Sequence, residues 1–313
     1  MNNFKYRFTV FTATYNRCDM LPQLYESLVK QTFDRSRFEW IIVSDGSTDN
    51  TPSVVKGFVD TGELNIRFIN KENGGKHTAW IAATPKFEGE YVVTCDDDDP
   101  VDPRMLEIFD KYWSELEKSP VYDSFWEVKA RVKREDGVLV GPELSQPYFD
   151  SDYNEMVFKY GINCEMHGCR KSTVMKSLAA VPNYFPFQDK CSNYPEGIRW
   201  SAAARRFKTR FVPEVTRTYV VGHDSLCVTT DKRKRSSRKN YNSIVSALCC
   251  INNQKDLFLK YKPLKYYTFF AHLAHSAVRQ NISVVKYINS SSDRVIYRIL
   301  FPPIYFFTKL GII

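Results

Sequence analysis

The sequence lacks several features that mark whole classes of protein. None of its eight cysteines stands in a CxxC pair or in another zinc-ligand spacing. No stretch reaches about 18 uninterrupted apolar residues, and the first residues, MNNFKYRFTVFTATYN, hold no apolar core followed by a small-residue cleavage site. These absences argue against a zinc-stabilised domain, a transmembrane helix and a secretory leader. They favour reduced structural thiols in a cytoplasmic protein.

Acidic residues are scarce in the last third of the chain. The whole sequence has 44 Lys+Arg and 36 Asp+Glu, a formal charge of +8. Residues 1–198 hold 23 Lys+Arg and 31 Asp+Glu, net −8, whereas residues 199–313 hold 21 and 5, net +16. A cationic segment attached to an acidic body typically seeks phosphate, whether on nucleic acid, on a lipid headgroup or on a substrate.

Short apolar strands alternate with helical patterns in the first 118 residues. Strands are predicted at residues 6–13, 38–43, 64–70 and 90–95, and helices at residues 19–31, from 51, at 76–83 and at 103–118. This alternation predicts an α/β fold with a mainly parallel sheet flanked by helices. A length of 313 residues allows one large domain with an appendage.

Beyond residue 118 the alternation loosens. The pattern there predicts a hairpin around Glu135-Asp136-Gly137, helices at 150–160 and 194–207, strands at 163–170 and 216–222, and only helices from residue 231 onward. A linker predicted at Thr229–Arg238 divides the chain into residues 1–228, a catalytic domain, and residues 229–313, a basic and aromatic-rich helical region.

Polar clusters follow each of the first four predicted strands. They read TYNR, SDGSTD, NKENGGK and DDDDP. Because the carboxyl ends of parallel strands lie along one edge of an open sheet, where ligands bind, these four clusters are expected to form one site.

The four adjacent aspartates Asp96–Asp99 are the sharpest of these features. Their carboxylates repel one another, and their place at the end of an apolar strand is unfavourable unless a cation neutralises them. Mg²⁺ or Mn²⁺ fits, because such ions bind one or two carboxylates together with substrate phosphate oxygens. The alternative is a solvated acidic loop that caps the next helix. The neighbouring clusters favour the metal.

Three other positions suit a nucleotide. Asp45 comes directly off a strand, where its carboxylate can accept a hydrogen bond from a base edge or a ribose. Tyr15 can stack on a base, although a buried aromatic side chain is the commoner use of such a residue. Gly74-Gly75-Lys76 precedes a helix, so backbone N–H groups and an ammonium can meet a phosphate there. The segment is not a P-loop, because GxxxxGK[ST] is absent.

The runs FTVFTATYNR, IIVSDGSTDNT, NKENGGKHTAW and GEYVVTCDDDDPVDP closely resemble the nucleotide-sugar-binding half of family 2 glycosyltransferases, which have the Rossmann-like GT-A fold. The resemblance is dense from residue 6 to about residue 110, weaker to about residue 225 and absent in the basic tail. It implies nucleoside contacts from Thr14, Tyr15, Arg17 and Asp45, a diphosphate contact from Lys76, ribose and metal contacts from Asp96 and Asp98, and either part for Asp99.

Such enzymes place a catalytic base in a later acidic motif, often Glu-Asp at the start of a helix. The matching place is Tyr194-Pro195-Glu196-Gly197, where Gly197 replaces the second carboxylate. Glu196 is therefore the candidate base, and Asp189 is the nearest other candidate. The alternative role for Glu196 is structural, as a carboxylate in the first turn of a helix, where the helix dipole favours negative charge. The resemblance also offers His223 as a metal ligand, although a lone histidine is more often structural.

The reaction that the resemblance implies is a single displacement with inversion. A carboxylate takes the proton of an acceptor hydroxyl as it attacks the anomeric carbon of a nucleotide sugar, which is expected to be a UDP-sugar. A metal neutralises the departing diphosphate. The acceptor is expected to be a glycan or a lipid-linked saccharide, as in the synthesis of bacterial surface polysaccharides.

The basic tail combines cations with interrupted apolar segments. Lys232-Arg233-Lys234-Arg235 is followed by aromatic residues and by VIYRILFPPIYFFTKLGII. This pattern favours a surface that lies on an anionic bilayer rather than crossing it. We therefore expect a cytoplasmic protein peripheral to the inner face of the membrane.

Two alternatives remain from the sequence. A nucleic-acid-binding protein could use the cationic tail, but the body is acidic and no RNP, helix-turn-helix or zinc-finger signature is present, so no nucleic-acid partner is expected. A catalytically inactive GT-A protein that binds sugar nucleotide or scaffolds an assembly is supported only by Gly197.

Overall fold

The computed structural model describes residues 4–141, 143–144, 146–179, 187, 196–220 and 237–310. A nine-stranded sheet in these ranges has the order β3-β2-β1-β4-β8-β5-β9-β7, with β6 paired to β5. Its strands are β1 Tyr6–Thr14, β2 Phe38–Ser44, β3 Asn65–Asn70, β4 Gly89–Thr94, β5 Phe125–Arg134, β6 Leu139–Val140, β7 Phe149–Ser151, β8 His167–Lys171 and β9 Lys208–Tyr219.

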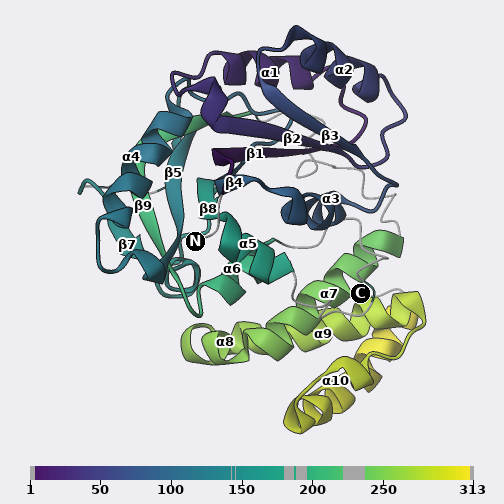
Figure 1. The fold of residues 1–313 in the computed structure, drawn as a ribbon. Coiled ribbons are helices and arrows are strands. Elements are labelled where there is room, and N and C mark those ends of the chain that lie inside the picture. The colour runs from purple at the N-terminus through teal and green to yellow at the C-terminus, as the bar shows by residue number, and fades with distance from the viewer. Residues whose placement is uncertain are drawn as a thin grey trace.

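Helices cover both faces of this sheet (Figure 1). They are α1 Leu21–Val29, α2 Thr51–Thr61, α3 Lys76–Ala83, α4 Met105–Glu117, α5 Ser172–Ala179 and α6 Gly197–Ala203. On β2, Trp40 and Ile42 pack into the core shared with α1, α2 and α4, whereas Ile41 and Val43 pack toward α3, α5 and α6. Burial on both faces explains why this strand is a continuous apolar run. The predicted first four strands and their helices are confirmed.

The sheet is mixed rather than mainly parallel over its full width. Strands β1 to β4 pair in parallel, as predicted. Beyond β4, strand β8 is antiparallel to both of its neighbours, while β5 and β9 are parallel to each other. The β5–β6 pair is the predicted hairpin. The prediction of parallel pairing therefore holds for the half of the sheet that carries the polar clusters.

Residues 150–160 differ from the single helix that was predicted there. Phe149–Ser151 forms the short strand β7, antiparallel to β9, and a π-helix at Glu155–Lys159 follows it. The Arg210 guanidinium donates to both Asp150 carboxylate oxygens at 2.9 and 2.8 Å and so holds β7 on β9. This contact joins residues far apart in the chain, so local periodicity does not reveal it.

The C-terminal helices form a second core. They are α7 Ser237–Asn253, α8 Lys255–Tyr261, α9 Pro263–Gln280 and α10 Ser291–Lys309. In Figure 1 they lie below the sheet domain, with α10 outermost. The Arg205–Asp256 ion pair (2.6 Å) and the edge-to-face contact of Phe158 with Phe258 join them to that domain. None of the helices in the described ranges has both the length and the hydropathy to cross a bilayer. The boundary after residue 228 lies outside the described residues and stays a prediction.

Candidate functional site

The first three strands end in step. In the parallel register Thr14 pairs with Ser44 and Ser44 pairs with Asn70, so the polar segments that follow the three strands begin at one edge of the sheet. Direct contacts join them: the Ser47 hydroxyl accepts from the Asn16 backbone N–H at 3.0 Å. The predicted convergence is therefore confirmed for the clusters that follow β1, β2 and β3.

Asp45 organises the loop that precedes α3. Its buried carboxylate accepts hydrogen bonds from the backbone N–H groups of Gly74 (3.1 Å) and Gly75 (2.6 Å), and from the Lys71 ammonium (2.5 Å). The loop lies so close that a Cβ on Gly46, whose φ is +78°, would approach the backbone nitrogen of Asn73 to 2.6 Å. Asp45 thus positions the backbone of the loop, and its contact with a nucleoside stays a prediction.

Tyr15 lies at the open edge of the site. Its side chain is 48% exposed, so the commoner expectation of a buried aromatic residue is wrong here, while Thr14 behind it is buried. Arg17, two residues further, points into the aspartate cluster. Its Nη1 donates to Asp97 Oδ1 at 3.1 Å and to Asp98 Oδ2 at 2.7 Å.

The four aspartates alternate between open and buried positions. The side chains of Asp96 and Asp98 are 32% and 23% exposed, whereas those of Asp97 and Asp99 are 6% and 2% exposed. Burial raises the pKa of Asp97 above its ordinary value and raises that of Asp99 to about 7, although Arg217 opposes the shift at Asp99. Asp96 and Asp98 are therefore the two aspartates whose side chains are more accessible to solvent.

Arg217 is a residue of the site that the sequence did not reveal. It lies on β9 with a side chain only 3% exposed, and its Nη1 lies 3.1 Å from both Asp96 Oδ2 and Asp99 Oδ2. Its Nη2 donates to Glu165. Burial alone would lower the pKa of Arg217, but these carboxylates raise it above its ordinary value, so the charge is held. An arginine inside a strand 121 residues from Asp96 carries no local signal of this contact.

Lys76 brings the candidate base to the aspartates. Its ammonium lies 2.6 Å from Asp96 Oδ1 and 3.6 Å from Glu196 Oε1. Burial raises the pKa of Asp96, but the nearby cations Lys76 and Arg217 lower it by more. The pKa therefore lies below its ordinary value and the carboxyl group is ionised. Glu196, which follows Asp96 by 100 residues in the sequence, thus lies beside the predicted nucleotide site. Asp189 and His223 lie outside the described residues.

The donor set suits an ion that takes part of its shell from a ligand. Among the described residues, no group of three or more His, Cys, Asp or Glu side chains is arranged to hold a metal by itself. Asp96 and Asp98 offer carboxylate oxygens at the open edge, which is the share that a protein commonly gives to Mg²⁺ or Mn²⁺ beside substrate phosphates. The residues present therefore fit such an ion in company with a diphosphate.

Comparison with known families identifies the chain. The model of the family "Glycosyl transferase family 2" matches residues 9–170, which is more than half of the sequence. The chain belongs to glycosyltransferase family 2. This confirms the resemblance found in the sequence, and the matched residues include Thr14, Asp45, Lys76 and the aspartates.

Relatives in sequence match over the same part of the chain. Poly(ribitol-phosphate) beta-N-acetylglucosaminyltransferase TarS of Staphylococcus aureus is 32% identical over 100 residues, which are 32% of this chain and 18% of TarS. Glycosyltransferase GlyG of Streptococcus pneumoniae is 29% identical over 119 residues, 38% of each protein. The match therefore spans less than a fifth of TarS and well under half of GlyG.

Similar structures extend over nearly the whole chain. S. aureus TarS 1–349 in complex with UDP-GlcNAc superposes with a TM-score of 0.64 at 15% identity, covering 97% of this chain and 91% of that one. Mannosyltransferase PcManGT from Pyrobaculum calidifontis, in complex with GDP-Man and Mn²⁺, gives a TM-score of 0.55 at 18% identity, covering 98% and 84%. The predicted GT-A fold with a helical C-terminal region is confirmed.

Proposed function

We propose that this protein transfers a sugar with inversion from a nucleotide sugar, a UDP-sugar, to a hydroxyl of a glycan or a lipid-linked saccharide. One observation carries the proposal: Lys76 lies between Asp96, at the end of β4, and Glu196, at the start of α6. The cation proposed for the diphosphate, the carboxylate proposed for the metal and the candidate base thus lie at one place. The UDP and UDP-GlcNAc complexes of the similar structure TarS 1–349 support the choice of donor.

Each side chain then has a defined task. Tyr15 presents an exposed ring on which a base can stack, and Arg17 and Lys76 supply positive charge for the diphosphate. Asp98, with Asp96, would hold Mg²⁺ or Mn²⁺, which supplies a Lewis acid that neutralises the departing diphosphate. Asp99 already binds Arg217 and the Val220 N–H, and its part as a metal ligand stays a prediction, as does that of His223.

Glu196 acts as the general base in this proposal. Its carboxylate is partly exposed, so an acceptor hydroxyl can reach it, and the Lys76 ammonium keeps it beside the donor. The proton of the acceptor passes to a Glu196 carboxylate oxygen as the hydroxyl attacks the anomeric carbon from the face opposite the diphosphate. Inversion follows from that single displacement.

Calorimetry with UDP, GDP and Mn²⁺ tests the ligand assignment. The wild-type protein is expected to bind UDP more tightly with Mn²⁺ present than without it, and more tightly than GDP. Asp98→Asn should weaken this Mn²⁺ dependence, whereas Asp60→Asn, which removes an exposed carboxylate on α2, should leave it unchanged. Binding without any donor turnover would favour the inactive-scaffold alternative, and an absence of nucleotide binding would overturn the proposal.

We also propose that the enzyme works on the inner face of the membrane, bound peripherally to anionic lipid. Residues 241–310, whose side chains the structure describes, contain 9 Lys+Arg and 2 Asp+Glu, a net charge of +7. A surface with this charge is attracted to anionic headgroups. The two predicted parts of the chain then divide the work, with residues 1–228 binding the donor and residues 229–313 binding the membrane.

A further inference from the structure

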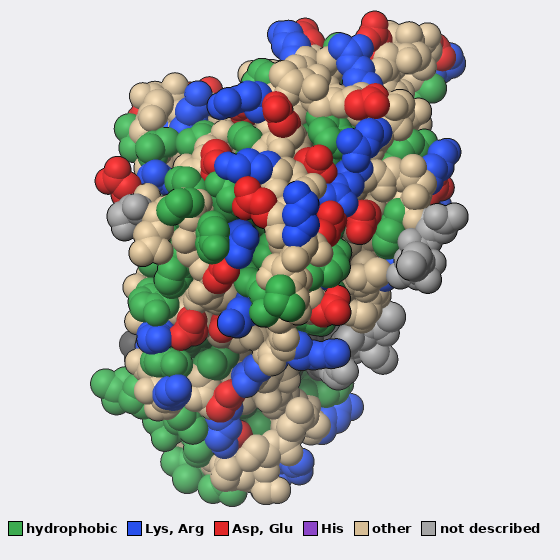
Figure 2. All heavy atoms as spheres, turned by 60° about the vertical axis from the view of Figure 1, so that its left-hand side comes forward, with side chains coloured by type: hydrophobic (Ala, Val, Ile, Leu, Met, Phe, Trp, Pro, Cys, Tyr) green, Lys and Arg blue, Asp and Glu red, His purple; other side chains and the backbone are tan. Residues whose placement is uncertain are grey.

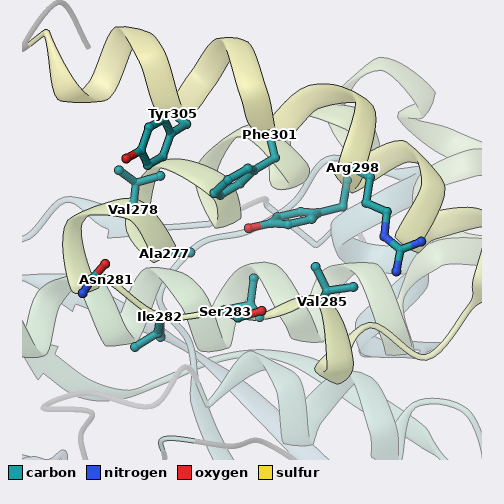
Figure 3. A pocket seen from close by; sticks show the side chains of 11 residues that line it. Ala277, Val278, Asn281, Ile282, Ser283, Val285, Arg298, Phe301 and Tyr305 are labelled. Carbon is teal, nitrogen blue, oxygen red and sulfur yellow. The ribbon is translucent and has the colours of Figure 1, made fainter.

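Helix α10 has apolar side chains on two sides. The inner side packs on α9: Tyr297 is buried, and Phe301 and Ile304 join the same core. Figure 3 shows Phe301 and Tyr305 reaching from α10 toward Ala277 and Val278, with a pocket of about 410 Å³ between the two helices. This side of the helix therefore already has a partner within the chain.

The outer side of α10 carries a stripe of large apolar side chains in solvent. Its members are Val295, Ile299, Phe306 and Leu310, each between 53% and 68% exposed. At 3.6 residues per turn they fall within about 60° of one another around the helix axis. Pro302 lies in the same stripe and is exposed. A continuous apolar stripe on the outermost helix marks a contact surface rather than scattered exposed residues.

The charges around this outer stripe are positive. Arg298 and Lys309 are exposed on α10 itself. The two acidic residues in the sequence from 241 to 310 are both paired, Asp256 with Arg205 at 2.6 Å and Asp293 with Lys255 at 2.9 Å. No unpaired carboxylate within residues 241–310 opposes the approach of an anionic surface.

The position of α10 leaves the outer stripe accessible. Figure 1 places the helix at the lower edge of the molecule, farther from the sheet than α9. Figure 2, which is turned about the vertical axis, shows exposed hydrophobic side chains at the height of the C-terminal helices, and the exposed apolar residues of α10 are those named above. A large flat or fluid partner can therefore reach this side without contacting the sheet domain.

We infer that α10 is the element that inserts into the membrane interface, lying along an anionic bilayer with the outer stripe among the upper acyl chains. A second copy of the chain is a poorer occupant, because it would bring one net positive surface against another. The 19 residues make a helix about 28 Å long, but Arg298, Lys309 and the low hydropathy oppose insertion across the bilayer. This inference rests on the proposed work at a membrane and not on the proposed chemistry.

Vesicle flotation of the full-length protein tests the inference. The wild type is expected to float with vesicles of phosphatidylcholine and phosphatidylglycerol and to stay unbound with phosphatidylcholine alone. The double variant Ile299→Glu/Phe306→Glu should lower the partition coefficient by at least about tenfold, because two apolar side chains lose their burial and two negative charges are added. Val59→Glu/Val121→Glu, which changes exposed valines of the sheet domain in the same way, should bind as the wild type does.

Two results would overturn the inference. One is equal flotation of the wild type and the α10 variant. The other is a dimer in sedimentation velocity that the α10 variant abolishes, with no vesicle binding by the wild type, because the outer stripe would then be an interface between copies. Circular dichroism and UDP calorimetry on each variant report folding and the donor site separately. A failed membrane test with intact UDP binding therefore leaves the proposed reaction standing.

Discussion

Three cationic side chains, Arg17, Lys76 and Arg217, neutralise the consecutive aspartates at the end of β4. From the sequence we predicted a divalent metal beside these carboxylates, and that metal stays a prediction. Arg17 and Lys76 were also predicted as part of the site. The sequence did not reveal Arg217, because a buried arginine in a strand is recognised only from the carboxylates around it. Glu196 was predicted from the family resemblance, but only the structure shows that it lies beside Lys76.

Arg217→Ala is expected to destabilise the protein. The substitution leaves the buried Asp99 and the ionised Asp96 without a cation that lies 3.1 Å from each, so the free energy of unfolding should fall by about 3–5 kcal/mol. Urea unfolding measures this change. Arg104→Ala is the control, since Arg104 is exposed and its change should stay within about 0.5 kcal/mol. Equal effects of the two substitutions would show that Arg217 does not hold the cluster together.

At the scale of elements, the strand ends were predictable and the later connections were not. The first four strands and their helices carry strong local patterns, so their order and the convergence of their loops followed from the sequence. Strand β7 depends on a contact with a distant segment, Arg210 on β9, and Gly197 at the start of α6 lies close to the Tyr153 side chain. The packing explains the glycine at position 197, because a Cβ there would lie only 2.6 Å from Tyr153 Oη.

Gly197→Ala should therefore lower stability, and Tyr153→Phe should relieve the effect. The added methyl group meets the Tyr153 hydroxyl oxygen, and such overpacking costs about 1–3 kcal/mol. Without that oxygen, the next atom of the ring is Cζ at 3.6 Å, an ordinary contact. Thermal unfolding of the single and double variants measures the coupling. Additive losses in the double variant would contradict this placement of the start of α6.

At the scale of the whole molecule, one buried histidine links the two halves of the sheet. His167 on β8 lies with Nε2 3.0 Å from the Thr94 carbonyl oxygen on β4 and Nδ1 2.9 Å from the Thr216 hydroxyl on β9. Burial, assisted by Arg217, lowers the pKa of His167 well below its ordinary value, so the imidazole is neutral in the fold. Local sequence patterns do not reveal this arrangement, because the two contacts come from strands that are distant in the chain.

Acid should reduce stability through His167. The pKa of His167 is lower in the folded state than in the unfolded state, so the unfolded state binds the proton first as the pH falls. The contribution of neutral His167 to the free energy of unfolding is therefore complete above pH 6.5 and is lost as the pH falls below that value. Between pH 7.0 and 5.5 the wild type should lose more free energy of unfolding than His167→Gln does, by on the order of 1 kcal/mol. Urea unfolding of both proteins at the two pH values measures the difference. Identical losses would mean that His167 titrates normally.

Donor turnover by Glu196→Gln and by the wild type, with UDP affinity determined on the same samples, decides whether Glu196 is the base. Turnover is expected to fall by about 10²–10⁴-fold while UDP binding is kept, because the amide preserves the shape of the side chain and cannot take the proton. Glu63→Gln, a change at an exposed carboxylate far from the site, should turn over donor as the wild type does. Unchanged turnover in Glu196→Gln would remove Glu196 from the mechanism and contradict the proposed displacement.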